Sequence, residues 1–259
     1  MENENADALT GKKIFFLNPS AIIKNEIAYE LIHQEYEVYY AADPVKLRRV
    51  LKKYGDSVVL INIDEGLPIK DWDIWIRTVL GDPATTEISI GVVSAVHNPA
   101  MEQKYVSSME LPCGFTFINK SDILKSIKQI YAILQKVDAR GRRKYLRAAS
   151  ENESLTTINI PHNGRFLNGV IKDISAAGFS CAFKEDPDLE KNYLCHDIQI
   201  KLQSVILKTE AIVFGARMDG LAKIYVFLFT QRIDPDVRIK IRMYIQSIMQ
   251  AKMDILLLQ

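Results

Sequence analysis

The chain lacks the cysteine content that marks a disulfide scaffold or a cysteine-rich metal site. Only three cysteines occur among its 259 residues, Cys113, Cys181 and Cys195, and their spacing forms neither a paired set nor a metal-ligand motif. An odd, scattered set of this kind is typical of reduced thiols in a cytosolic protein. We therefore expect a cytoplasmic protein whose thiols are free.

Long apolar runs and an excess of one charge are also missing. No run reaches the roughly 18 apolar residues that a membrane span needs. The polar start MENENADALTGKK lacks the pattern of a secretory signal. The formal net charge is only +1, so the chain is not a general polyanion binder and nucleic acid is not an expected partner. Any attraction for phosphate must be local.

A recognisable catalytic set is the third absence. The sequence contains no paired carboxylates, activated nucleophile or phosphate-binding glycine loop of the Walker type. His162 and His196 have no metal-like neighbours, and the pair Cys195–His196 lacks a third catalytic partner. We expect a protein that is not an enzyme and that holds no metal and no cofactor.

The first half of the chain alternates strand-like and helix-like segments. Short apolar runs, several of them continuous, occupy residues 12–18, 37–42, 57–64, 87–95 and 114–120. Helical patterns lie between or after them, at residues 20–34, 43–55 and 121–137 among others. In the second of these, Asp43 is placed to cap the helix and Pro44 to occupy its first turn. This alternation predicts an α/β fold, a doubly wound parallel sheet covered on both faces.

The second half has a different pattern. Residues 154–183 and 196–233 contain short runs rich in Ile, Val, Phe and Thr, separated by glycines and tight turns. They predict an all-β barrel or sandwich. The segment after Asp234 has helical spacing, with Asp234 as its N-cap and Pro235 in its first turn. Its apolar end, ILLLQ, suits two roles, a plug for the barrel or a dimer contact. We expect two domains, 1–138 and 139–259.

The first half resembles the receiver domain of response regulators over about residues 10 to 138. Asp64 stands where receivers keep their phospho-accepting aspartate, followed by Pro68, while Ser94 and Lys120 match the switch Ser or Thr and the lysine. The acidic pair that holds Mg²⁺ in receivers is replaced by Asn18–Pro19. A hard dication prefers carboxylates, and aspartyl phosphorylation depends on it. We therefore expect a degenerate receiver that serves as a docking or dimerisation platform.

The start of the second half carries a two-part motif. RKYLR supplies Arg143 and Arg147, and DISAAG supplies Asp173, Ser175 and Gly178. Together they resemble the R-x-x-x-R and [D/N]-x-S-x-x-G signature of PilZ domains, here over about residues 139 to 259. The resemblance implies a non-enzymatic receptor for cyclic di-GMP, with the arginines on a loop that folds over ligand resting on the barrel. It also implies that Arg142, just before the motif, favours a stacked pair of ligands.

These residue types suit the chemistry of such a ligand. A guanidinium is a planar fork that pairs with phosphate oxygens or with the O6 and N7 edge of guanine. Asp173 can accept from the N1–H and the amine of guanine, and Ser175 can bond a phosphate or a base. Gly178 permits a positive φ or a close approach of the base. The expected ligand site is Arg142, Arg143, Arg147, Asp173, Ser175 and Gly178.

Other interpretations stay open at this point. The arginines could be a basic helix end that is favourable to the helix dipole, and DISAAG a β turn in which Asp173 and Ser175 bond local backbone. At the level of function, the alternatives are a ligand-free adaptor and a phospho-response regulator with a PilZ output. The main hypothesis is that ligand reorients the two domains and alters binding of an unidentified downstream protein. Motility and virulence control use such receptors, and a homodimer is compatible with the sequence.

Overall fold

The computed structural model describes residues 11–150 and 155–259. The described chain divides into two compact units, one of Met1–Lys144 with Met249–Gln259 and one of Tyr145–Ile248. The expected domains, 1–138 and 139–259, differ from these units in two ways. The segment up to Lys144 is counted with the first unit, and so is the end of the C-terminal segment. Most of the polar start, and the beginning of the run at 154–183, lie outside the described residues.

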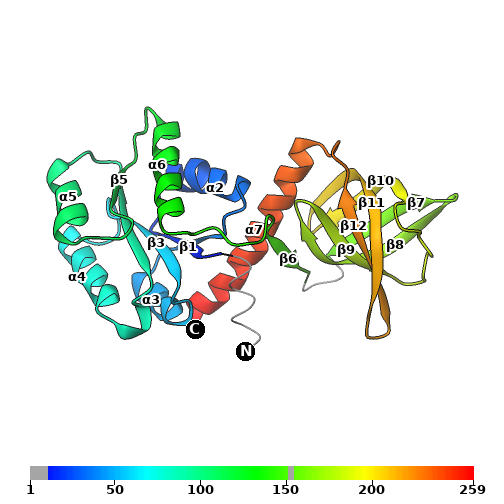
Figure 1. Cartoon of the computed structure of the whole chain (residues 1–259), viewed down its shortest axis with the longest axis horizontal. Helices are drawn as coiled ribbons and strands as arrows, with labels where there is room; N and C mark the ends of the chain where they lie inside the picture. Colours follow the sequence, from blue (N-terminus) through cyan, green and yellow to red (C-terminus); the bar gives the residue numbers. More distant parts are fainter. Residues whose placement is uncertain (1–10, 151–154) are drawn as a thin grey trace. The chain divides into compact units, whose positions relative to one another are not determined.

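The first unit is built on a five-stranded parallel sheet in the order β2-β1-β3-β4-β5 (Figure 1). This order is the flavodoxin-like form of a doubly wound sheet. The strands lie inside the five runs expected from the sequence, so this part of the fold prediction is confirmed. Their bounds are β1 Lys13–Leu17, β2 Val38–Ala41, β3 Ser57–Asn62, β4 Ser89–Ser94 and β5 Phe115–Phe117.

Helices cover both faces of this sheet. One face packs against the first helical segment, η1 (Ile23–Ala28, a π-helix) and α2 (Tyr29–His33), and against α6 (Ile123–Lys136). The other packs against α3 (Pro44–Lys53) and α4 (Ile69–Leu80). The short helices are η2 Pro83–Thr85, α5 Pro99–Gln103 and η3 Lys104–Ser108. The two faces alternate along each strand, as Ile14 and Phe15 illustrate: they are fully buried in different clusters.

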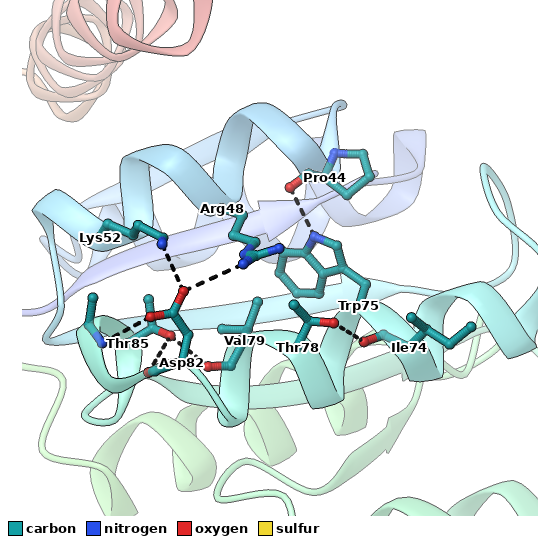
Figure 2. A network of polar contacts seen from close by, with 10 residues as sticks. Pro44, Arg48, Lys52, Ile74, Trp75, Thr78, Val79, Asp82 and Thr85 are labelled. Atoms are coloured by element: carbon teal, nitrogen blue, oxygen red, sulfur yellow. Dashed lines mark hydrogen bonds and ion pairs between the residues drawn. The ribbon is translucent and has the colours of Figure 1, made fainter.

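Side chains fix α3 against α4 and the turn that follows it. Asp43 caps α3 as expected, since its Oδ1 accepts from the backbone N–H of Val45 at 2.8 Å. Trp75 of α4 donates from Nε1 to the carbonyl of Pro44 at 2.9 Å. The carboxylate of Asp82 receives Lys52 at 2.8 Å and Arg48 at 3.5 Å (Figure 2). These contacts hold the helical layer together at its surface.

The second unit is a closed antiparallel barrel of six strands, β7 to β12 (Figure 1). The strands follow the order β8-β7-β10-β11-β12-β9, and the pairing of β8 with β9 closes the ring. A short strand, β6, pairs with the C-terminal end of β8, at Asp173 to Ser175. The bounds are β6 Arg147–Ala149, β7 Thr156–His162, β8 Arg165–Ser175, β9 Gly178–Phe183, β10 Leu194–Leu202, β11 Val205–Asp219 and β12 Ala222–Phe229. The predicted fold class, a parallel α/β sheet plus a β barrel with a C-terminal helix, is confirmed.

The C-terminal helix α7 (Pro235–Leu258) contributes residues to both units. Asp234 caps it as expected, accepting from the backbone N–H of Asp236 at 2.8 Å. In its last part, Met253 is buried in the core of the first unit. The side-chain amide of Gln250 donates to the carbonyl of Tyr40 at 3.0 Å and accepts from its N–H at 2.9 Å. Because Tyr40 lies on β2, an edge strand, Gln250 satisfies backbone groups that no neighbouring strand pairs with.

The apolar end of the chain does not plug the barrel. Leu256 and Leu257 pack against the same core cluster as Met253, which is a cluster of the first unit. The expectation of a barrel plug is therefore wrong, because the parallel sheet of the first unit and its helices offer this end an apolar surface. Within residues 11–150 and 155–259, no helix has both the length and the apolar character needed to cross a membrane.

Candidate functional site

Strand β6 brings Arg147 next to the DISAAG segment. In the β6–β8 register, Arg147 lies opposite Ser175 and Ala149 lies opposite Asp173. The Nη1 atom of Arg147 is 3.9 Å from Oδ1 of Asp173, and the arginine side chain is 60% exposed. A pair this exposed contributes little to stability. Because the side chain of Arg147 is mostly exposed, an anion in solvent can reach its guanidinium.

Asp173 owes its position to an irregularity in β8. The register against β9 shifts between Ile171 and Asp173, which is a β-bulge, and Asp173 then pairs with Ser180. Bulges re-aim side chains in this way. The hydroxyl of Ser180 donates to Oδ2 of Asp173, so Ser180 orients the carboxylate while Oδ1 faces Arg147. Sequence reasoning missed Ser180. The only signal was its position two residues after Gly178 in an alternating strand.

Ser175 and Gly178 form the two ends of the tight turn between β8 and β9. The Oγ of Ser175 donates to the carbonyl of Gly178 at 3.1 Å and accepts from the N–H of Ala177 at 3.3 Å. Gly178 does not have a positive φ. A Cβ there would lie 2.0 Å from the carbonyl oxygen of Phe227 on β12. Both residues thus have structural roles in the turn and the barrel, and their expected ligand contacts stay predictions.

The remaining arginines of the cluster lie before the barrel. Arg142 and Arg143 are exposed and belong to an irregular segment counted with the first unit. The structure therefore brings together four of the six predicted ligand residues, all within the second unit. Arg140 has a local role, because its Nη2 donates to the carbonyl of Gln34 at 3.0 Å and its guanidinium lies over the ring of Tyr36.

The carboxylate of Asp64, the predicted phospho-acceptor, accepts hydrogen bonds from the residues at the end of β4. Asp64 lies just beyond the end of β3, and its Oδ1 accepts from the hydroxyl of Ser94 at 2.5 Å. Its Oδ2 accepts from the N–H of Ala95 at 2.6 Å. Lys120 is exposed and makes neither a hydrogen bond nor an ion pair with Asp64. The structure thus brings Asp64 and Ser94 together.

The position of the missing acidic pair holds an amide that points inward. Asn18 has a left-handed backbone, with φ of 55°. Its carbonyl accepts from Nδ2 of Asn62 at 3.0 Å, while its own Nδ2 is buried without a hydrogen-bond partner. Among the residues that the structure describes, no group of three acidic, histidine or cysteine side chains is arranged to hold a metal ion.

Comparison with protein-family models gives no match, and comparison with curated proteins gives none either. Solved structures do match. The PilZ domain of YcgR from Escherichia coli with c-di-GMP is 15% identical, with a TM-score of 0.38, and the match covers 44% of this chain and 95% of that one. The MrkH–c-di-GMP complex of K. pneumonia is 21% identical, with a TM-score of 0.39, covering 45% of this chain and 57% of that one.

A third match is the Bacillus subtilis inhibitor of motility, MotI/DgrA. It is 15% identical with a TM-score of 0.37, and the match covers 44% of this chain and 52% of that one. This chain thus spans about half the length of MotI/DgrA and somewhat more of MrkH. These structures are PilZ domain proteins, and the similarity falls on the C-terminal part of the chain. At such identities it concerns the fold alone, and the receiver resemblance of the first unit stays a prediction.

Proposed function

We propose that this chain is a receptor for cyclic di-GMP that acts by binding and not by catalysis. The observation that carries the proposal is the placement of an exposed guanidinium, Arg147, beside the carboxylate of Asp173 on the barrel. One group matches a phosphodiester or the O6 and N7 edge of guanine, and the other accepts from the N1–H and amine of guanine. Adenine lacks that pair of donors, so Asp173 favours guanine.

Arg143 and Arg142 complete the proposed pocket from the preceding segment. Arg143 is four residues before Arg147, so the chain holds their Cα atoms within about 14 Å of each other. This segment folds over the ligand and supplies further charge-assisted hydrogen bonds to the phosphates. Arg142 contacts a second, stacked ligand, so we expect two ligands per protomer. Ser175 and Gly178 contribute mainly by forming the turn beside which the ligand rests.

The proposal rests on the residues of this chain. Two of the similar structures, those of YcgR and MrkH, are described with c-di-GMP, which makes that ligand the first to test. The balance of charge in the rest of the chain agrees with a local anion site, since the formal net charge is only +1. Such a protein attracts a small dianion through a few placed arginines and does not attract polyanions in general.

Binding would reorient the two units and so alter a partner-binding surface. Ligand orders the arginine segment, which directly joins the end of α6 to β6, the first strand of the second unit. Helix α7 contributes residues to both units, so it is a second covalent connection through which they are linked. A ligand shifts such an equilibrium only if it favours one arrangement. Small-angle scattering with and without c-di-GMP tests this, and superimposable profiles would refute the reorientation.

Calorimetric titration with c-di-GMP tests the binding site itself. Arg143→Ala, Arg147→Ala and Asp173→Ala should each lose a charge-assisted contact of about 1.5–3 kcal/mol, which is roughly ten- to over a hundredfold in affinity. The matched control is Arg165→Ala, an exposed arginine at the opposite end of β8. Asp64→Ala should also leave the affinity unchanged, because Asp64 belongs to the first unit.

The possible outcomes separate the alternatives. Micromolar or tighter binding that the arginine variants lose supports the receptor, and the stoichiometry distinguishes one ligand from a stacked pair. An affinity that stays within a factor of about two in either arginine variant contradicts the pocket assignment. If the wild type shows neither heat of binding nor thermal stabilisation with c-di-GMP, the ligand-free adaptor is the alternative that remains. Stable labelling of Asp64 by acetyl phosphate would support a phospho-response regulator.

A further inference from the structure

A pocket of about 610 Å³ lies at the end of the parallel sheet where the strands begin. Lys13, the first residue of β1, lines this pocket, and so does Asp56, which directly precedes β3. All of the lining residues belong to the first unit. Because the strands are parallel, Asp64, just beyond the carboxyl end of β3, lies at the opposite end of the sheet. The pocket is therefore separate from the predicted phospho-acceptor position.

Three glycines present main chain to this pocket, Gly11, Gly55 and Gly141. Gly11 has a φ of 88°, and a Cβ on it would lie 2.3 Å from the backbone nitrogen of Gly141. The two segments approach this closely only because Gly11 carries no side chain. Gly55 differs, since its φ is not positive and a Cβ there would make only an ordinary contact, 3.7 Å from the carbonyl oxygen of Ala84. A side chain can therefore be introduced at Gly55 without strain.

Cationic side chains outnumber carboxylates around the pocket, with Lys12, Lys13, Lys53, Arg140 and Arg142 against Asp56 and Asp138. Two of the lysines have anionic partners. Nζ of Lys12 is 2.7 Å from Oδ1 of Asp56, and Nζ of Lys13 is 3.5 Å from Oε1 of Glu37, which is buried. The remaining lining groups are three cations and one carboxylate, so the pocket keeps an excess of two positive charges.

The ring of Tyr54 gathers two of the lysines. Nζ of Lys13 lies 4.7 Å from the centroid of this ring, and Nζ of Lys53 lies 5.7 Å from it. Contact with a ring orients an ammonium group without neutralising its charge. The two ammonium groups therefore repel each other, and an anion between them relieves the repulsion. The side chain of Lys13 is only 12% exposed, so its position is already fixed in the absence of a ligand.

We propose that this pocket binds an anion with at least two negative charges, of the kind that a diphosphate group supplies. Such a ligand matches the excess of two positive charges. Its oxygens accept from ammonium and guanidinium groups and from main-chain N–H groups of the kind that glycines leave accessible. Lys53 is the group best placed to contact the ligand, because it is exposed and forms no ion pair with a described residue. The inference goes beyond the receptor function and does not depend on it.

Calorimetric titration of the full chain with pyrophosphate tests the pocket. We expect the wild type to bind with a Kd of about 1 mM or tighter. Gly55→Asp places a carboxylate beside the pocket and should weaken binding more than about tenfold, whereas Gly55→Ala, its matched control, should stay within a factor of about two. Lys53→Gln should weaken binding about three- to tenfold. Its control is Lys128→Gln, an exposed lysine of α6 that does not line the pocket.

Titration with ADP distinguishes two sources of the diphosphate group. Tighter binding of ADP than of pyrophosphate identifies a nucleotide as the ligand, and equal or weaker binding identifies a free diphosphate. Two results overturn the site: a wild type that binds neither anion, or a folded Gly55→Asp that binds pyrophosphate like Gly55→Ala. Thermal melts report whether each variant is folded. Arg142 is left unaltered because the proposed messenger site uses it as well, so titration of the wild type with c-di-GMP reports the receptor function separately.

Discussion

Replacing Gly178 by alanine tests whether this glycine serves the barrel or the ligand. In the structure Gly178 pairs with Leu228, and a Cβ at this position would lie 2.0 Å from the carbonyl oxygen of Phe227. Real Cβ atoms essentially never approach another atom within 3.0 Å. The obstacle is backbone, so β9 and β12 must separate by about 1 Å. We therefore expect Gly178→Ala to destabilise the barrel.

The magnitude follows from two costs. Overpacking a well-packed site costs typically about 1–3 kcal/mol. Weakening a hydrogen bond beside this contact, such as that from the N–H of Phe229 to the carbonyl of Ala177 just before β9 at 2.9 Å, adds about 0.5–1.5 kcal/mol. The expected loss is thus roughly 2–4 kcal/mol. For a unit of this size, each kcal/mol lowers Tm by about 4–8 °C, so the barrel should melt roughly 8 to 30 °C lower.

Thermal unfolding followed by tyrosine fluorescence measures this shift, and c-di-GMP titration of the same variant at low temperature measures binding. Gly215→Ala is the matched control, because Gly215 lies on β11 of the same barrel, has no positive φ and has open space where a Cβ would be. It should stay within about 0.5 kcal/mol of the wild type. If Gly178→Ala melts like Gly215→Ala yet loses c-di-GMP, the glycine serves the ligand and the steric argument is refuted.

Other substitutions probe the rest of the molecule. Met253→Ala should destabilise the first unit by about 2–5 kcal/mol in a urea titration, because the side chain is buried in its core, whereas exposed Ile255→Ala should change it by less than about 0.5 kcal/mol; equal effects would contradict the docking of α7. The hydrogen bond from Lys223 lowers the pKa of Asp186 to about 2. A carboxyl group whose pKa is lowered in the folded state stabilises the fold at pH values above its ordinary pKa of 3.8. This contribution is lost as the pH falls toward 2. Melts between pH 6 and 2 should therefore show Asp186→Asn approaching the wild type, and a gap that stays constant would exclude the linkage. Burial raises the pKa of Cys195 to about 11, so thiol labelling at pH 8 should be slow in the native protein and fast in urea, and rapid native labelling would contradict this burial.

The features that the sequence predicted well depend on local chemistry. The parallel strands of the first unit appear as separate apolar runs, and the Asp43–Pro44 cap fixes the start of α3 within one turn. In the barrel, β7 alternates more and less buried residues around Ile158 and Ile160, and this period of two is the pattern that predicts a strand. Each of these signals is contained within about ten residues of the chain.

The features that escaped prediction depend on contacts between distant segments. The apolar end of α7 has a helical pattern, but the pattern does not specify which core receives it, and Gln250 meets Tyr40 across 210 positions of the chain. In the same way, Ser180 became part of the site only through the bulge that sets Asp173 opposite it. The close approach of β9 to β12 likewise explains Gly178, which no local rule connects with Phe227.

The D-x-S-x-x-G string therefore combines two physical roles. Ser175 and Gly178 close the turn and let β9 approach β12, and a barrel of this kind needs them whether or not a ligand binds. Asp173 differs, because its partly exposed carboxylate faces Arg147 and gains little stability from so exposed a pair. A charged group that the fold does not require is the better indicator of a ligand. Asp173→Ala should bind more weakly, but it also leaves the buried hydroxyl of Ser180 without its acceptor. Comparison with Ser180→Ala, which removes the same hydrogen bond and keeps the carboxylate, separates receptor from scaffold.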